Sequence, residues 1–144
     1  MAPPVRTVEP PRALLHVDMP ARPRRALAPS AILAPMVVRS VEELRRNPVS
    51  ALFEGRRDGV ELSVFVTTFG PGDGPRLHRH PYAELFLVEE GEARFDVGGE
   101  GCEVGAGSFV VVPPETAHRF ENSGAGALRV LSIQPSGEVQ QTLV

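Results

Sequence analysis

The sequence contains no lysine and no tryptophan, and Cys102 is its single cysteine among 144 residues. One cysteine excludes an internal disulfide and a cysteine-based zinc cage, and it fits a reducing compartment, so we expect a cytoplasmic protein. All 15 basic residues are arginines, and they form no basic stripe with interleaved aromatic residues. The sequence also has no segment typical of a helix-turn-helix. We therefore expect no nucleic-acid partner.

Glycine and proline are abundant, with 14 glycines and 15 prolines in the chain. These residues interrupt helices and form turns, so the composition argues against long helices and favours an all-β protein. The length and the hydrophobic content of 42% are enough for one core and too little for two. One domain is the expectation.

Residues 1–35 differ from the rest, because they hold eight of the 15 prolines and five arginines against two acidic residues. This composition predicts a Pro/Arg-rich disordered tail, followed by a folded domain at residues 36–144. His16 lies in the tail without partners, and we expect it to be solvated. Pro29 and Pro35 interrupt the apolar run at residues 26–38, which argues against an export signal or membrane segment. Met36 remains open as an alternative start.

A short helix is expected at the beginning of the folded domain. Ser40 followed by Glu43 is a capping-box pattern, and it predicts a helix over Val41–Arg46. Asn47 and Pro48 then end the helix. We expect this element to act as a lid or to contribute to an interface.

From residue 49 onward the hydrophobic pattern has a period of two, which is typical of β-strands. Short strands with glycine-rich turns between them predict a β-sandwich or barrel. No helical segment is available for parallel crossovers. The predicted strands are Ala51–Glu54, Val60–Phe69, Leu77–His80, Glu84–Val88, Ala93–Val97, Cys102–Val104, Phe109–Val112, Ala117–Glu121, Leu128–Gln134 and Val139–Leu143.

Three side chains that can bind a metal fall within seven positions. His78 and His80 are two residues apart, so on an extended strand both imidazoles project to the same side. Glu84 has the same parity, although Pro81 lies between and can bend the chain. His118 follows on a later strand. Imidazole and carboxylate together suit Fe, Mn, Ni, Co, Cu or Zn, whereas a histidine pair alone is more often a packing or surface pair.

The spacing around these residues resembles the two conserved motifs of the cupins. The first motif is glycine, five residues, His-x-His, three or four residues, glutamate, six residues and glycine. The second is glycine, five residues, Pro-x-Gly, two residues, histidine, three residues and asparagine. Glu115 departs from the second motif, since it stands at the position of the family's turn glycine. The matching residues are Gly72, His78, His80, Glu84 and Gly91 for the first motif, and Gly107, Pro113, His118 and Asn122 for the second.

The resemblance covers about residues 50–135, and it is closest to the small single-domain cupins of bacteria. It implies a double-stranded β-helix, or jelly roll, with one divalent transition metal inside the barrel. The implied ligands are His78, His80, Glu84 and His118, and Fe²⁺ is the favoured ion. Metal ligands must be deprotonated, so metal affinity is expected to fall as the pH drops through the histidine range. A homodimer is also implied, because cupins commonly pair.

Among cupins with these ligands, the chemistry ranges from oxygenases to isomerases, lyases and polyketide cyclases. We favour an oxygenase that acts on a small apolar or aromatic molecule, with a non-redox enzyme or a binding module without turnover as alternatives. Glu84 is either a ligand or a general base. Tyr82 is expected to have a packing or loop role more than a catalytic one. Arg119 is expected at the surface or at an interface, and Cys102 is expected to be inert. The residues expected to line the pocket are Tyr82, Phe86, Val88, Val110, Val112, Phe120, Arg76 and Gln134.

Overall fold

The computed structural model describes residues 35–144, and within this range the chain is almost entirely β-structure. The predicted tail and His16 lie outside the described residues, apart from Pro35, so the domain boundary stays a prediction. The strands are β1 (Arg45–Asn47), β2 (Ser50–Glu54), β3 (Ser63–Phe69), β4 (His78–Arg79), β5 (Glu84–Glu90), β6 (Glu92–Val97), β7 (Glu100–Gly105), β8 (Phe109–Val112), β9 (His118–Asn122), β10 (Leu128–Gln134) and β11 (Thr142–Leu143).

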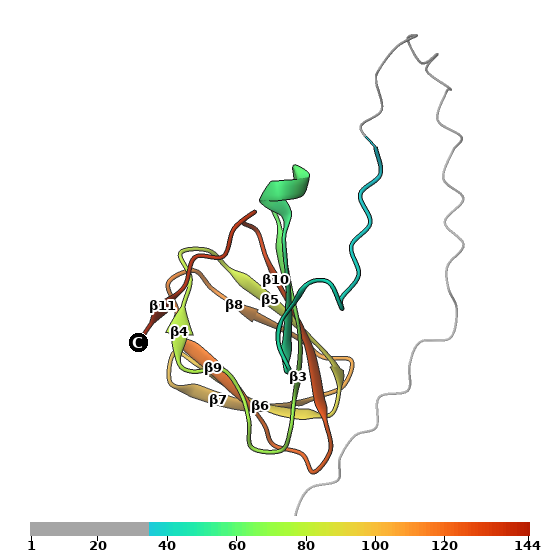
Figure 1. Ribbon diagram of the computed structural model, residues 1–144. Helices are drawn as coiled ribbons and strands as arrows, with labels where there is room; N and C mark the ends of the chain where they lie inside the picture. The colour runs from blue at the N-terminus through green and yellow to red at the C-terminus, as the bar shows by residue number, and fades with distance from the viewer. Residues whose placement is uncertain (1–34) are drawn as a thin grey trace, which may run out of the picture. The chain divides into compact units, whose positions relative to one another are not determined.

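The strands form two antiparallel sheets that face each other (Figure 1). The six-stranded sheet has the order β1-β2-β3-β10-β5-β8, and the five-stranded sheet has the order β11-β4-β9-β6-β7. The chain passes between the sheets repeatedly, for example from β4 to β5 and from β5 to β6. This arrangement is the jelly roll that the strand pattern and the cupin resemblance predict.

The hydrophobic core fills the space between the two sheets. It follows from strict alternation along the strands, as in β6, where Ala93 and Phe95 are fully buried and their neighbours are exposed or partly exposed. Phe95 lies at the centre, with its ring stacked on Phe120 at 5.0 Å and edge-on to Phe86 at 5.2 Å. The buried core residues are Phe86, Val88, Ala93, Phe95, Val112, Phe120, Leu128 and Val130.

The helix predicted over Val41–Arg46 is wrong. The capping hydrogen bond from the Glu43 amide to Ser40 Oγ does form, at 3.2 Å, but it closes only a single turn. The chain then continues into β1, whose pairing with β2 is extended by a hydrogen bond from the Leu52 amide to the Leu44 carbonyl at 3.0 Å. A helix of six residues is costly to nucleate, so a hydrogen-bonded sheet edge replaces it.

Three predicted strands are shorter in the structure, and one of them, expected over Leu77–His80, is limited to the two residues of β4. β3 begins at Ser63 because the preceding residues form a 3₁₀ helix, Gly55–Asp58, and a loop closed by a hydrogen bond from the Gly55 amide to the Leu62 carbonyl at 2.9 Å. The last strand, expected over Val139–Leu143, is limited to the two residues of β11. Before β11, the Val139 amide donates to Glu54, and the Gln140 amide and carbonyl bond to Tyr82 and His80 instead of a neighbouring strand.

Glu115 keeps the backbone conformation that the glycine of the cupin motif would supply. Its φ angle is 58°, in the left-handed region, and it is the only non-glycine residue with a positive φ among residues 35–144. This conformation costs about 1–2 kcal/mol for a residue with a Cβ atom. A hydrogen bond from the Glu115 amide to the His80 carbonyl, 2.8 Å long, holds the turn. The substitution therefore leaves the local geometry of the motif intact.

The outward face of the six-stranded sheet is apolar across four neighbouring strands. Each strand alternates, so the residues between the core positions project outward. They are in register and form two cross-strand rows, of which the β8 members are 65% and 66% exposed and the others are partly exposed. We call these eight residues the outer apolar face: Val64, Ile133, Leu85 and Val111 in one row, and Val66, Leu131, Leu87 and Phe109 in the other.

Candidate metal centre

The four predicted ligands meet between the two sheets. His78 on β4 and His118 on β9 are directly paired residues of the five-stranded sheet, and Glu84 begins β5 in the six-stranded sheet. His80 lies in the segment that connects the two sheets. All four side chains are at most 5% exposed, and one nitrogen or oxygen atom from each lies within 4.8 Å of the others. The fold therefore places the four predicted ligands close together.

All three histidine rings are oriented by backbone carbonyl groups. Nδ1 of His78 donates to the Arg76 carbonyl at 2.6 Å, and Nδ1 of His80 donates to the Gln140 carbonyl at 2.6 Å. Nδ1 of His118 donates to the Thr116 carbonyl at 2.8 Å. Since a carbonyl oxygen can only accept, each Nδ1 carries the proton and each Nε2 of the neutral ring presents a lone pair. This orientation is typical of metal-binding histidines.

Glu84 is held so that one carboxylate oxygen faces the histidines. Oε1 accepts hydrogen bonds from the Ser132 hydroxyl and, at 2.9 Å, from Gln134 Nε2. Oε2 lies 2.8 Å from His118 Nε2 and 3.1 Å from His80 Nε2. With both donors from β10 on Oε1, Oε2 is the atom available as a ligand.

These donor atoms fit a divalent metal ion. With Nδ1 protonated, the His118 Nε2 lone pair would face a carboxylate oxygen at 2.8 Å, which is unfavourable unless a cation or an extra proton lies between them. His80 Nε2 is buried and has no hydrogen-bond partner in the described residues. A buried polar atom without a hydrogen-bond partner requires an explanation, and binding to a metal ion would explain this one. Three imidazole nitrogens and one carboxylate oxygen suit a divalent transition metal.

The electrostatics of the cluster keep Glu84 ionised. Burial alone would raise the pKa of its carboxyl, but the adjacent His118 and His80 rings and the Ser132 hydroxyl outweigh burial and hold the pKa well below its usual range. Burial lowers the pKa of His78, which favours the neutral ring that binds metal. Burial would lower the pKa of His80, but the Glu84 carboxylate 3.1 Å from its Nε2 and the hydrogen bond from its Nδ1 to the Gln140 carbonyl outweigh burial and raise the pKa.

A cavity of about 210 Å³ opens directly onto the metal centre. His78 and Glu84 belong to its lining, which is otherwise formed mainly by aromatic rings and small polar side chains. The aromatic residues are Phe65 and Phe69 from β3, Phe86 from β5 and Phe120 from β9. A molecule in this cavity would contact ligand atoms on one side and apolar rings on the other.

The residues expected to line the pocket fall into three groups. Phe86, Phe120 and Gln134 line the cavity. Val88 and Val112 are buried in the hydrophobic core and are not part of the cavity lining, and Val110 is partly buried against the same core. Val88 lies two residues beyond Phe86 on β5. Val110 and Val112 are the partners of Phe86 and Glu84 on β8, the edge strand on the side of β5 away from the strands that line the cavity.

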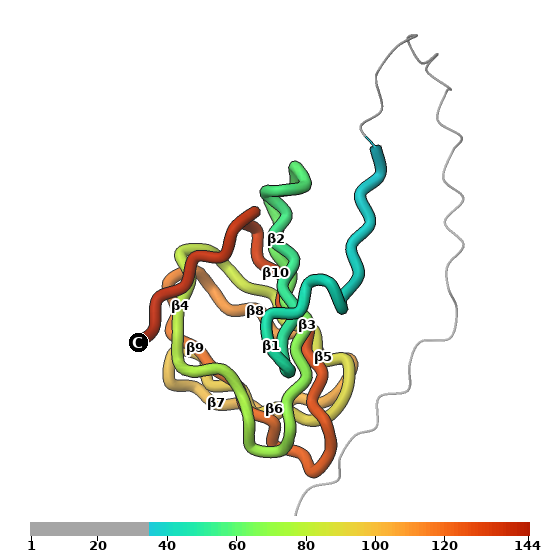
Figure 2. Tube along the Cα trace, in the orientation of Figure 1, coloured from blue at the N-terminus to red at the C-terminus, as the bar shows by residue number. Residues whose placement is uncertain are grey.

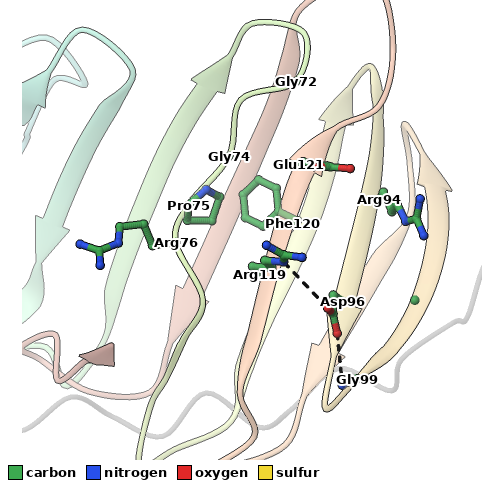
Figure 3. Close-up of a pocket in the computed structure, with 11 residues that line it drawn as sticks. Gly72, Gly74, Pro75, Arg76, Arg94, Asp96, Gly99, Arg119, Phe120 and Glu121 are labelled. Carbon is green, nitrogen blue, oxygen red and sulfur yellow. Dashed lines mark hydrogen bonds and ion pairs between the residues drawn. The ribbon is translucent and has the colours of Figure 1, made fainter. Parts of the chain in front are cut away.

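Tyr82 and Arg76 do not line the cavity, contrary to the prediction, and each contacts the centre in another way. The Tyr82 ring stacks on the His80 imidazole at 5.3 Å, and its hydroxyl binds Gln134. Arg76 supplies its carbonyl to His78, whereas its side chain lines a separate pocket of about 620 Å³ on the outside of the five-stranded sheet. In that pocket Arg76 points away from Arg94 and Arg119, and Arg119 is paired with Asp96 at 3.8 Å (Figure 3). These arginines do not converge on one point.

Sequence reasoning missed Ser132 and the carbonyl acceptors. Ser132 and Gln134 are polar residues on the buried face of β10, and their spacing of two in an otherwise apolar strand was the available signal. The carbonyls of Arg76, Thr116 and Gln140 have no signature in side-chain type. Asn122, the last residue of the second motif, has a structural role, since its Nδ2 donates to the carbonyls of Phe69 at 3.0 Å and Gly126 at 2.8 Å.

Two facing antiparallel sheets with three histidines and one glutamate gathered between them define a jelly-roll protein with an internal metal site. A family model described as a cupin domain matches residues 65–134, which include the whole of both motifs, from Gly72 to Asn122. Residues 65–134 of the chain therefore form a cupin domain.

Known proteins of several kinds are similar to this chain. An uncharacterized protein of Methanocaldococcus jannaschii is 31% identical over 74 residues, covering 51% of this chain and 59% of that protein. Auxin-binding protein 1 of Arabidopsis thaliana is 32% identical over 82 residues, covering 51% and 41%. Polyketide synthase CurC of Streptomyces cyaneus is 36% identical over 62 residues, covering 42% and 40%. The matches therefore span less than two thirds of each relative's length.

Solved structures share the fold. A Bacillus subtilis oxalate decarboxylase described with Mn(II) centres superposes with a TM-score of 0.61 at 22% identity, covering 69% of this chain and 29% of that chain. The formate complex of Lactobacillus farciminis oxalate decarboxylase gives 0.63 at 18% identity, covering 72% and 34%. At this identity the likeness concerns the fold alone. Within residues 35–144, no helix has the length and hydrophobicity that a membrane span requires.

Proposed function

We propose that the protein is an oxygenase-type enzyme that depends on a divalent metal, with Fe²⁺ favoured, and acts on a small apolar or aromatic molecule. The observation that carries the proposal is the cavity beside the ligands, whose lining combines His78 and Glu84 with four phenylalanines. Its volume of about 210 Å³ is below the roughly 300–1,000 Å³ of common ligand clefts. The substrate is therefore small, and its apolar part contacts the rings.

The chain's own residues hold the substrate and the ligands in place. When bound, the metal supplies Lewis acidity or, if it is iron, redox chemistry. The phenylalanine rings exclude water from the cavity and orient the apolar part of the substrate. Gln134 and Ser132 hold Glu84 Oε1, so Oε2 faces the histidines and acts as a ligand. A role of Glu84 as general base would require the loss of these two hydrogen bonds, and we favour the ligand role.

Oxygen consumption tests the proposal. Protein loaded with Fe²⁺ under anaerobic conditions is mixed with oxygenated buffer and a panel of phenols, thiols and diketones, and oxygen uptake is followed with an electrode. We expect uptake that depends on one compound class and is absent in the His78→Ala/His80→Ala variant. No uptake across the panel with full iron loading would contradict oxygenase chemistry.

A second candidate is a non-redox enzyme, and the similarity to polyketide synthase CurC favours it. The donor set also binds redox-inert ions, and Lewis-acid chemistry needs no change of oxidation state. Product formed by the Zn²⁺-loaded protein, detected by mass spectrometry, would identify this class. Tight binding of a panel compound without any product would instead identify a binding module, a function that the name of auxin-binding protein 1 suggests for that relative.

We also propose that two copies of the chain pair through the outer apolar face. Its eight residues include no charged side chain, whereas residues 36–144 carry ten arginines against 16 acidic residues. Two copies with the same negative net charge can therefore meet there without burying like charges. Exposed apolar patches of this kind mark interaction surfaces more often than chance.

Size measurement tests the pairing. Light scattering after gel filtration is expected to show a dimer for the native chain and a monomer for the Phe109→Glu/Val111→Glu variant. Both residues are exposed, so the substitutions do not disturb the core. Arg94→Glu on the opposite sheet is the matched control and should leave the dimer intact. A monomeric native protein, or a variant that remains a dimer, would contradict the proposed interface.

A further inference from the structure

The last nine residues cross the open end of the barrel beside the metal centre. After β10 the chain turns at Ser136 and runs along the end of the barrel to β11, which pairs with β4 next to His78 (Figure 2). We call residues 136–144 the C-terminal strap. Gln141 from the strap belongs to the lining of the cavity. The strap therefore forms part of the cavity wall beside the site.

Hydrogen bonds, more than apolar burial, hold the strap. Most of its residues from Gln140 to Val144 are exposed, including Leu143 at 51%. Ser63 Oγ donates to the Ser136 carbonyl at 2.7 Å, and Arg56 pairs with Glu138 at 2.7 Å near one end of the strap. A segment with little apolar burial opens at a lower free energy than the whole domain unfolds. Its few specific contacts near the site therefore decide how firmly it is placed.

One hydroxyl group connects the strap to two of the four metal ligands. Tyr82 OH accepts a hydrogen bond from the Gln140 amide at 2.9 Å and donates its proton to Gln134 Oε1 at 2.8 Å. The Gln140 carbonyl accepts from His80 Nδ1, and Gln134 Nε2 donates to Glu84 Oε1. The hydroxyl thus holds the Gln140 residue whose carbonyl orients His80. It also orients the Gln134 side chain so that Nε2 faces Glu84.

The donor and acceptor pattern of this network leaves little freedom. A tyrosine hydroxyl has one proton, which it gives to Gln134 Oε1, so the amide nitrogen of Gln134 must face Glu84. Its lone pair then accepts the Gln140 N–H group. The tyrosine ring stacks nearly parallel on His80, with 7° between the planes, so it also supports that imidazole from its face.

We propose that Tyr82 is a positioning residue for the metal centre, acting on His80 through the Gln140 carbonyl of the C-terminal strap and on Glu84 through Gln134. This inference rests on the proposed metal site. The strap is then part of the site: it presents the carbonyl that keeps His80 Nε2 turned toward the other ligands. Groups of this kind, which orient ligands without touching the metal, commonly contribute 10- to 100-fold in affinity.

The Tyr82→Phe variant tests this role, since it keeps the stacked ring and removes only the hydroxyl. Chelator competition with Mn²⁺ is expected to show roughly 10- to 100-fold weaker binding at an unchanged stoichiometry. The EPR spectrum of the bound Mn²⁺ should change as well, because the ligand arrangement relaxes. In the metal-free protein, the Gln140 amide should exchange its hydrogen faster, because it has lost its acceptor.

Glu138→Gln is the matched control. Glu138 lies on the same strap but away from the ligands, and the substitution breaks its ion pair with Arg56. Mn²⁺ affinity and the EPR spectrum should remain unchanged. A circular dichroism melt checks that both variants fold. If Tyr82→Phe binds Mn²⁺ with native affinity and spectrum, the positioning role is overturned although the metal site stands. If the native protein binds no metal, both the proposed function and the positioning role are overturned. The exchange rate of the Gln140 amide then tests only whether the Tyr82 hydroxyl holds the strap.

Discussion

Replacing both His78 and His80 with alanine is expected to abolish stoichiometric metal binding. The change removes two of four buried donors and leaves Glu84 Oε2 with only His118. The loss should exceed the roughly 100-fold effect that the removal of an outer hydrogen-bonding group can have. Elemental analysis of native and variant protein, purified side by side without added metal, measures it. The native protein should carry one divalent ion per site and the variant none.

Arg79→Ala is the control for this experiment, because Arg79 lies between the two histidines and is exposed. It makes a surface ion pair with Glu115 at 3.7 Å. Such pairs contribute about 0–1 kcal/mol, so the fold and the metal content should not change. Retention of stoichiometric metal in the double histidine variant would refute the site.

Replacing Phe95 with alanine is expected to destabilise the domain severely. The ring is fully buried between the sheets and contacts both Phe86 and Phe120. Phenylalanine-to-alanine changes in a core cost about 3–5 kcal/mol, and domains of this size are stable by only about 5–15 kcal/mol. Denaturant unfolding, monitored by circular dichroism, should show a large decrease in the free energy of unfolding.

Val38→Ala is the control outside both the core and the outer apolar face. Val38 is 77% exposed, and surface changes usually stay within about 0.5 kcal/mol. Phe95 does not line the cavity beside the metal, so the folded fraction of Phe95→Ala should still bind metal at native stoichiometry. An unfolding free energy close to the native value would show that the core can close around the missing ring.

The site also shows why a motif residue can change without loss of geometry. Glu115 replaces the glycine of the second cupin motif and still adopts a positive φ of 58°. The hydrogen bond from its amide to the His80 carbonyl ties this turn to a metal ligand. The cost of the left-handed conformation, about 1–2 kcal/mol, is small compared with the interactions of the surrounding strands.

The sequence by itself determined the fold class, most strands and the four ligands. Alternating burial, as in Ala93 and Phe95, depends on the period of two, which is local and can be read directly. The motif spacing identified His78, His80, Glu84 and His118 because glycine turns and histidine pairs are properties of neighbouring residues. Local signals failed where two structures competed, as at Val41–Arg46, where pairing with β2 replaced the helix.

Only the tertiary structure decided what surrounds the ligands. Ser132, Gln134 and the Gln140 carbonyl lie 48 to 60 residues from the ligands they hold. Pairing of β10 with β5 brings the first two there, and the C-terminal strap brings the third. The same pairing placed Val88 and Val112 in the core and turned Tyr82 toward the strap. Contacts between distant segments depend on how the sheets pack, which a local pattern does not show. Backbone carbonyls are the same in every residue, so the sequence does not mark the ones that hold a ligand. The sequence therefore identifies the metal ligands, whereas the fold determines the groups that hold them in position.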